Sequence, residues 1–182
     1  VILISDIDEI PKMSSLDVRS IKNDLIFFKQ KMFYYKFNLC SKIINWFGTR
    51  ACKKKELLSP QWLRNIKSKS YPWWRIDVYF SKNKYTNLKI IEDGGWHFSY
   101  LNSPKEIEKK LKNYAHYREY ELDPLGLEKI KERIFNKTSV YNLSKDMRQS
   151  KFISGQKLEK VNLSVLPDYI SDNKDKYKDW LD

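Results

Sequence analysis

The most constraining feature of the sequence is a run of apolar residues, Val1 to Ile4, that leads directly into the acidic cluster Asp6 to Glu9. A short, continuous, β-branched run of this kind is typical of a buried parallel strand. Pro11 follows the cluster and blocks a simple continuation of regular structure. In open α/β sheets, ligands bind in the loop beyond the carboxyl end of a strand. We therefore expect the acidic cluster to lie in a ligand-binding loop.

Three later segments have the composition of strands. Leu25 to Leu39 is rich in Phe and Tyr and predicts one or two strands. Trp74 to Phe80 alternates weakly between apolar and polar residues, which is consistent with another strand. Lys89 to Leu101 predicts a strand interrupted by a turn at its Gly-Gly pair.

Helices are predicted at three places where a capping residue precedes a proline. Ser59 and Pro60 predict a short helix from about residue 61, and Ser103 and Pro104 predict an amphipathic helix over 103–120. A third helix is expected from Asp123 to about residue 136, and 158–182 predicts a short strand, a Pro-marked turn and a charged tail. We find no internal repeat and no linker, so the sequence predicts one α/β domain over residues 1–182.

Composition and charge limit the classes of partner. With 41% hydrophobic and 15% aromatic residues the chain is expected to fold, and no apolar run approaches the roughly 20 residues that span a bilayer. The net charge of +12 is compatible with nucleic acid, a nucleotide diphosphate or an acidic glycan. Because the lysines are spread along the whole chain rather than gathered in a stripe, we expect no nucleic-acid partner. Cys40 and Cys52 fit no metal motif and are expected to be free thiols.

The acidic cluster has the chemistry of a divalent-metal site. Asp6 and Asp8 are two carboxylates so close in sequence that they repel each other unless a cation or a proton lies between them. Oxygen ligands suit Mg²⁺ or Mn²⁺ bound to phosphate, and such a metal neutralises the charge of a departing diphosphate. The neighbouring Glu9 is a candidate general base or a residue that positions the ligands. A solvated acidic turn is the alternative for this motif.

A second group of candidate site residues surrounds the Gly-Gly pair. His97 is one of only two histidines and stands between Trp96 and an aromatic neighbour, which offer flat faces for a sugar or a base. His97 is a candidate metal ligand, although a packed core histidine has the same sequence signature. Asp93, next to Glu92, is a second candidate base, with a polar turn as the alternative. Arg64, on the first predicted helix, is a candidate for binding donor phosphates, and a solvated surface arginine is its alternative.

Taken together these motifs resemble glycosyltransferase family 17, the β-1,4-mannosyl-glycoprotein 4-β-N-acetylglucosaminyltransferase family, particularly its bacterial-type members. The resemblance covers most of the chain, and its most specific part is the pairing of SDIDEIP with GGWHFSYL. The weaker matching stretches are FYYKFN, WFGT, SPQWLR, AHYREY and VLPDYI.

The resemblance implies a GT-A-like fold, in which a mixed sheet is flanked by helices. It implies inverting transfer of N-acetylglucosamine, or a related sugar, from a UDP donor to a glycan hydroxyl, with Mn²⁺ or Mg²⁺ as cofactor. Asp6 and Asp8 would hold the metal and the diphosphate, and His97 would be a further ligand. The general base stays open between Glu9 and Asp93.

The chain also departs from the family. The strands that precede the metal motif in a GT-A-like fold are missing, and the chain begins at Val1 inside a strand-like run. We interpret it as a fragment whose preceding segment would allow membrane association. The compartment stays open: cytoplasm or membrane for a bacterial or viral protein, and the Golgi membrane for a eukaryotic one.

Two other function classes remain as alternatives. A haloacid-dehalogenase-like phosphatase also begins with an apolar strand and a D-x-D motif, in which Asp6 would be the nucleophile and Asp8 the acid or base, with Mg²⁺. That class usually continues with a Gly-Thr turn, where this chain has Glu9 to Pro11. The other alternative is a non-catalytic module that binds glycan or nucleic acid through aromatic and lysine side chains.

Overall fold

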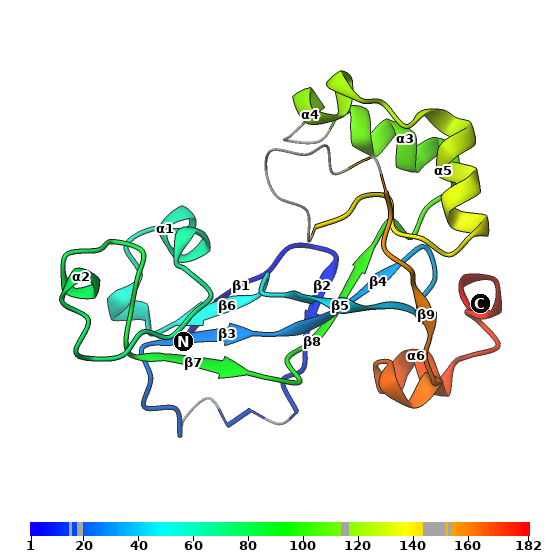
Figure 1. Cartoon of the computed structure of the whole chain (residues 1–182). Coiled ribbons are helices and arrows are strands. Elements are labelled where there is room, and N and C mark those ends of the chain that lie inside the picture. Colours follow the sequence, from blue (N-terminus) through cyan, green and yellow to red (C-terminus); the bar gives the residue numbers. More distant parts are fainter. Residues whose placement is uncertain (15, 18–19, 114–116, 144–151, 153) are drawn as a thin grey trace. The chain divides into compact units, whose positions relative to one another are not determined.

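The chain forms an α/β structure with two sheets and helices, which confirms the predicted class (Figure 1). The computed structural model describes residues 1–182 except 15, 18–19, 114–116, 144–151 and 153, and omits the side chains of 117–119 as well. The described residues divide into two compact units. The first consists of Val1–Lys31 and Asn45–His97, and the second of Met32–Ile44 and Phe98–Asp182. The prediction of a single catalytic domain stays a prediction.

The first unit contains a four-stranded mixed sheet. In spatial order its strands are β1 (Ile2–Ile4), β6 (Arg50–Cys52), β3 (Leu25–Phe28) and β7 (Leu88–Ile91). β6 runs antiparallel to both β1 and β3, whereas β7 runs parallel to β3. All four residues of β3 are buried, because both faces of the strand are covered: Leu25 and Phe27 pack into one cluster, and Ile26 and Phe28 into another.

The expectation of a buried parallel strand at Val1 to Ile4 is wrong in both respects. β1 is antiparallel to β6 and lies at one end of the strand order, where Val1 and Leu3 are exposed. A continuous apolar run indicates a strand but specifies neither its direction nor its position in the sheet.

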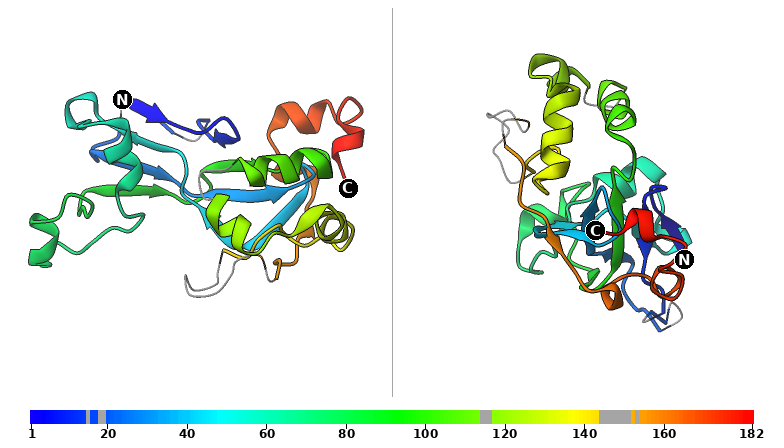
Figure 2. Two further views of the ribbon diagram at one scale, coloured as in Figure 1. Left: turned by 90° about the horizontal axis from the view of Figure 1, so that it is seen from above. Right: turned by 90° about the vertical axis from the view of Figure 1, so that its right-hand side faces the viewer.

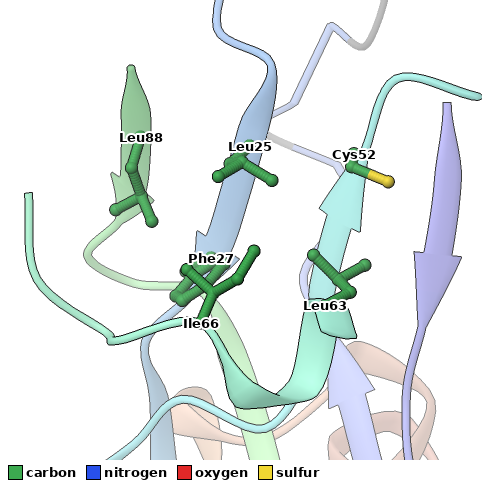
Figure 3. Packing of buried hydrophobic residues seen from close by; sticks show 6 residues of the cluster. All are labelled: Leu25, Phe27, Cys52, Leu63, Ile66 and Leu88. Carbon is green, nitrogen blue, oxygen red and sulfur yellow. The ribbon is translucent and has the colours of Figure 1, made fainter. Parts of the chain in front are cut away.

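One face of this sheet is covered by α1 (Pro60–Asn65), as Figure 3 shows. Ser59 caps the helix by accepting a hydrogen bond from the backbone N–H of Trp62, and Pro60 occupies the first turn, which confirms the predicted start. The buried cluster beneath it consists of Leu25, Phe27, Cys52, Leu63, Ile66 and Leu88. Each fully buried side chain of this size stabilises the fold by about 1.5–3 kcal/mol.

The predicted strand at Trp74 to Phe80 is wrong, because this segment contains the short helix α2 (Ile76–Tyr79). Val78 is the one buried residue of α2, while an ion pair joins Arg75 and Asp77. Apolar side chains with no consistent period fit a helix and a strand equally well, so the sequence pattern does not distinguish the two. In the structure the segment is helical, with Val78 buried. The turn η1 (Lys54–Glu56) joins β6 to the segment that leads into α1.

The second sheet has five strands, in the order β2-β8-β4-β5-β9. Their bounds are β2 (Glu9–Pro11), β8 (Gly95–Ser99), β4 (Gln30–Tyr34), β5 (Leu39–Trp46) and β9 (Glu159–Lys160). β4, β5 and β8 each contribute residues to both units. The strands predicted within Leu25 to Leu39 and on both sides of the Gly-Gly turn are confirmed.

The second unit contains the remaining helices: α3 (Pro104–Lys112), α4 (Tyr117–Leu122), α5 (Gly126–Phe135), η2 (Leu163–Val165), α6 (Asp168–Asp172) and η3 (Lys178–Trp180). α3 begins with a capping box between Ser103 and Glu106, as its sequence predicts, and it lies beside α5 (Figure 2). Where one helix was expected over 103–120, α3 ends at Lys112 and α4 starts at Tyr117; residues 114–116 are outside the described part. The charged tail predicted after the Pro-marked turn contains helix α6 and the short helix η3.

Candidate functional site

The acidic cluster forms a tight turn between β1 and β2. The backbone N–H of Glu9 donates to the carbonyl of Asp6 over 3.1 Å, which closes the turn. Glu9 then starts β2, where it lies directly opposite His97 in the antiparallel register with β8. Residues opposite each other in such a pair share one face of the sheet. The register therefore brings SDIDEIP and GGWHFSYL together, although the two motifs lie far apart in the sequence.

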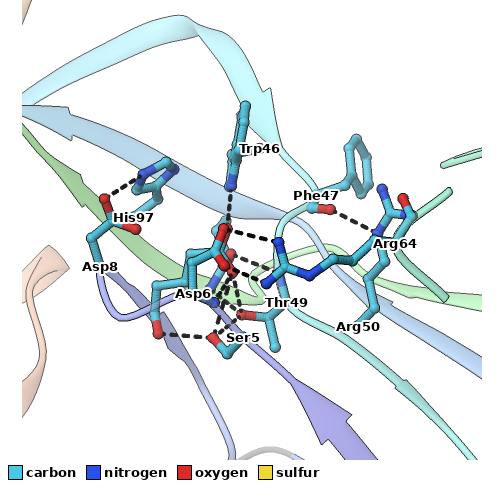
Figure 4. Close-up of polar contacts among 11 residues, drawn as sticks. Ser5, Asp6, Asp8, Trp46, Phe47, Thr49, Arg50, Arg64 and His97 are labelled. Atoms are coloured by element: carbon cyan, nitrogen blue, oxygen red, sulfur yellow. Dashed lines mark hydrogen bonds and ion pairs between the residues drawn. The ribbon is translucent and has the colours of Figure 1, made fainter. Parts of the chain in front are cut away.

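Glu9 is buried and accepts several hydrogen bonds. Figure 4 labels the residues that surround it, among them Ser5, Trp46 and Thr49. Its Oε1 accepts from the indole N–H of Trp46 over 2.6 Å, and its Oε2 accepts from the backbone N–H of Asp6 over 2.9 Å. The hydroxyl of Thr49 lies 3.4 Å from the same Oε2 and 2.8 Å from the Ser5 hydroxyl. A buried carboxylate that accepts this many hydrogen bonds fixes the backbone of its own loop.

Gly48 allows this close packing. A Cβ atom at position 48 would lie 1.6 Å from Oε1 of Glu9 and 2.2 Å from the indole nitrogen of Trp46. Any other residue at Gly48 would therefore displace the Glu9–Trp46 hydrogen bond.

Asp8 and His97 form the second feature of the site. Nε2 of His97 lies 3.5 Å from Oδ2 of Asp8, and the imidazole packs against the indole of Trp46 with 4.9 Å between ring centroids. His97 is almost fully buried, whereas the Asp8 side chain is partly exposed. Within the described part of the chain, Nδ1 of His97 is buried without a hydrogen-bond partner. The imidazole thus directs Nε2 toward the partly exposed Asp8.

Asp6 is directed away from Asp8, toward α1. Its carboxylate forms a two-pronged ion pair with the guanidinium of Arg64, whose Nη1 is 3.3 Å from Oδ2 of Asp6. This hydrogen-bonded partner raises the pKa of Arg64 above its ordinary value. Arg50, nearby, donates to the carbonyls of Leu63 and Ile66 at the end of α1, and burial lowers the pKa of Arg50 to about 10. Arg50 thus holds α1, and α1 carries Arg64.

A pocket of about 370 Å³ lies over these residues within the first unit. Its lining comprises Asp6, Glu9, Asn45, Trp46, Phe47, Gly48, Arg50, Arg64 and Ser68. The volume falls in the range of small-molecule sites, about 300–1,000 Å³. Two guanidinium groups, two carboxylates and an indole line the pocket, so it offers cationic partners for an anionic group and a flat apolar face for a planar one.

The predicted metal ligands fit a divalent ion only in part. Asp8 and His97 offer a carboxylate oxygen and an imidazole nitrogen at one place, a donor pair that suits Mn²⁺. Asp6 is bound to Arg64, and among the described residues no group of three His, Cys, Asp or Glu side chains is arranged to hold a metal. Asp8 and His97 would hold the ion, and water or ligand phosphate would supply further oxygen ligands.

Trp96 and Asp93, two other predicted site residues, lie apart from this group. Side chains alternate along a strand, so Trp96 faces the side of β8 opposite to His97, and it pairs with Ile10 in the register. Asp93 lies in the β7–β8 turn, where its exposed carboxylate receives hydrogen bonds from Lys12 at 2.5 Å and Lys31 at 3.0 Å. These lysines lower the pKa of Asp93, which weakens it as a base. Neither residue lines the pocket.

The sequence did not identify the residues that support Glu9. Trp46, Thr49 and Gln30 carry no catalytic motif, although the first two belong to the WFGT stretch that resembled the family. Gln30 donates to the Thr49 hydroxyl over 3.1 Å and accepts at 3.4 Å from the Thr49 backbone. The sequence signal was a glutamine, Gln30, inside an aromatic strand-like run, because a polar group that becomes buried in a strand needs hydrogen-bond partners.

Comparison of the chain with family models, with curated proteins and with solved structures gives no match. In the part of the chain that the structure describes, no helix has the length and apolar character needed to cross a membrane.

Proposed function

We propose that the chain is the metal- and donor-binding part of an inverting glycosyltransferase with a GT-A-like fold. It transfers N-acetylglucosamine, or a related sugar, from a UDP donor to a glycan hydroxyl. The observation that carries the proposal is the pairing of Asp8 with His97, 3.5 Å apart, from two motifs that are 89 positions apart in the sequence (97 − 8 = 89). The mixed sheet and the phosphate-compatible pocket beside it support the same reading.

The side chains at the pocket have distinct roles in this proposal. Arg64 binds the donor diphosphate, because a guanidinium forms two parallel hydrogen bonds with phosphate as it does with a carboxylate. In the structure the same guanidinium is paired with the carboxylate of Asp6. Asp8 and His97 would hold the metal ion, and the backbone of the same turn carries Asp6. A divalent ion held there would neutralise the negative charge that develops on the departing UDP.

Of the two candidate bases, Glu9 is the one that reaches the pocket. Its two carboxylate oxygens already accept from Trp46 and from the Asp6 backbone, so it holds the metal loop rather than a substrate hydroxyl. Asp93 stays paired with two lysines away from the lining. The proposal therefore assigns no residue of this chain as the base.

The first test is ligand-dependent thermal stability. Mn²⁺ and UDP added together should raise the melting temperature of the full chain, because a ligand that binds only the native state stabilises it. Asp8→Ala should abolish the rise, while the exposed Asp175→Ala serves as the matched control and should keep it. An unchanged response in Asp8→Ala would exclude Asp8 as a ligand.

The second test is turnover. UDP release from UDP-N-acetylglucosamine should depend on Mn²⁺ and fall by about a hundredfold or more in Asp8→Ala and in His97→Gln, since each removes stabilisation of the leaving diphosphate. A generic phosphate monoester distinguishes the rival phosphatase. Phosphate release that requires Asp6, measured with Asp6→Asn, would contradict the transferase.

A further inference from the structure

The segment between α1 and β7, residues 67–85, forms a loop whose ends are held together. The backbone N–H of Lys67 donates to the Asn83 carbonyl over 2.8 Å, and that of Tyr71 donates to the Tyr85 carbonyl over 3.3 Å. Within it, Val78 of α2 packs inward. We call residues 67–85 the aromatic loop (Figure 1). It is a defined structure within the first unit.

The aromatic loop presents large apolar side chains to solvent. Five of them are between 66% and 87% exposed: Trp73, Trp74, Ile76, Tyr79 and Phe80. Contacts within the loop hold some of these side chains in place. The Tyr79 hydroxyl donates to the Trp73 carbonyl over 2.8 Å, and the indole rings of Trp73 and Trp74 pack edge to face. A contiguous apolar cluster of this size on a protein surface indicates an interaction site, whereas single exposed apolar residues do not.

The aromatic loop is also rich in basic residues. The aromatic loop contains five basic side chains and one acidic one. The acidic one, Asp77, is neutralised by Arg75 and Lys84, whose hydrogen bonds lower its pKa to about 2. The three other lysines, Lys67, Lys69 and Lys82, are exposed.

We propose that the aromatic loop binds the surface of an anionic membrane. Trp and Tyr side chains favour the boundary between headgroups and acyl chains, and Phe80 and Ile76 enter the apolar side of that boundary. The exposed lysines then contact anionic headgroups. Apolar insertion and a basic patch are the two signals that together give stable peripheral binding, where either alone gives marginal binding.

Other occupants fit these residues less well. A sugar ring stacks on Trp or Tyr but leaves an aliphatic side chain such as Ile76 exposed to water. A second copy of the loop would bring its lysines against those of the first, at a cost in repulsion. An anionic membrane is the partner that satisfies both the charge and the purely apolar side chains.

The test measures sedimentation of the full chain with vesicles. Phosphatidylcholine vesicles that contain phosphatidylserine should bind the chain at least tenfold more tightly than phosphatidylcholine alone, and NaCl should weaken that binding. The combined substitution Trp73→Ser, Trp74→Ser and Phe80→Ser should lower the affinity at least tenfold. As the matched control, Phe135→Ser with Tyr169→Ser removes exposed aromatic residues elsewhere and should leave binding unchanged.

Reversing the charge of the exposed lysines separates their contribution to membrane binding from that of apolar insertion. Lys67→Glu, Lys69→Glu and Lys82→Glu together should abolish the preference for anionic vesicles. Lys174→Glu, at an exposed lysine of the second unit, is the single-site control for charge and should have little effect. All altered side chains are exposed, so unchanged melting temperatures should show that each variant is folded.

Insertion depth gives an independent readout. Lipids with brominated acyl chains should quench part of the tryptophan emission of the bound protein. Trp73→Phe with Trp74→Phe should keep vesicle binding but lose that quenching, because the remaining tryptophans lie outside the loop.

Two results would overturn the proposal. One is equal vesicle binding by the wild type and the loop variants. The other is absence of vesicle binding together with loop-dependent binding to an acidic polysaccharide such as heparin. Both are measured without Mn²⁺ or UDP, so they are independent of the glycosyltransferase proposal.

Discussion

At the scale of single residues, Glu9 determines whether the acidic turn keeps its shape. Its buried carboxylate accepts from a side chain, Trp46, and from the backbone of the turn at Asp6. Most of the polar groups that surround it are donors, so the position requires an acceptor at both oxygens.

Glu9→Gln should therefore destabilise the protein by about 1–3 kcal/mol, because the amide places an N–H₂ group against one of those donors. The change is measured by urea unfolding. The control is Glu92→Gln, whose exposed carboxylate pairs with Lys29 and should cost less than about 1 kcal/mol. A loss in Glu9→Gln no larger than in the control would show that the network does not hold the turn.

Asp93 gives a pH-dependent contribution of defined sign. Lys12 and Lys31 lower its folded-state pKa below the ordinary value of 3.8, so the native state binds fewer protons than the unfolded chain near that pH. The contribution is present above pH 3.8 and is lost as the pH falls through the lower folded-state value. Asp93→Asn should thus melt slightly below the wild type at pH 7 and together with it in strong acid. Because the pair is exposed, the gap should stay under about 1 kcal/mol, and a gap that widens in acid would contradict this assignment.

The sequence identified the Asp8–His97 pair but not the arrangement around it. Its motifs named both residues as candidate metal ligands, because carboxylate and imidazole ligands are recognisable by residue type, and the structure places the two side chains 3.5 Å apart. It did not show that Asp6 faces Arg64, since an ion pair between residues 58 positions apart depends on how α1 packs on the sheet. The opposite orientation of Trp96 and His97 follows from strand alternation once β8 is known.

At the scale of elements, the β2–β8 pairing positions the site, and Gly95 allows it. Gly95 has φ = +122°, and a Cβ there would lie 2.1 Å from the Ile10 carbonyl and 2.7 Å from the Lys12 nitrogen. Both the backbone conformation and the space exclude a side chain.

Gly95→Ala should cost about 3 kcal/mol or more in the free energy of unfolding, since strain and overlap add. Gly126→Ala is the matched control, because φ is also positive there, at +69°, while nothing lies within 4 Å of the added Cβ. We expect about 1 kcal/mol for the control. If urea unfolding gave equal losses of free energy for Gly95→Ala and Gly126→Ala, the overlap with the Ile10 carbonyl would relax without cost.

Elements with several consistent local signals were predictable, and those decided by one tertiary contact were not. α1 and α3 have a Ser cap followed by Pro, and both start where expected. β6 contains only Arg50 to Cys52, too short a run to be recognised, so the antiparallel partner of β1 could not be foreseen. α2 forms around a single buried residue, Val78, inside a segment whose composition favours strands.

At the scale of the whole molecule, the division into two units left no trace in the composition. Domain boundaries are usually sought in Gly-, Pro- or Ser-rich linkers, and here the boundaries fall inside β4, β5 and β8. Strand residues on either side of such a boundary have the same composition of apolar and aromatic side chains, so the sequence does not mark it. The mixed α/β class could therefore be predicted from the sequence, whereas the partition could not.

Both cysteines are thiols, as expected, and both are buried; Cys52 belongs to the first unit and Cys40 to the second. Each unit thus contains a single thiol that reagents reach only when the surrounding structure opens. In Cys40→Ala, labelling of Cys52 reports the opening of the first unit, and Cys52→Ala reports the second. Equal opening free energies would mean that the units unfold as one cooperative body, and unequal values would rank their local stabilities.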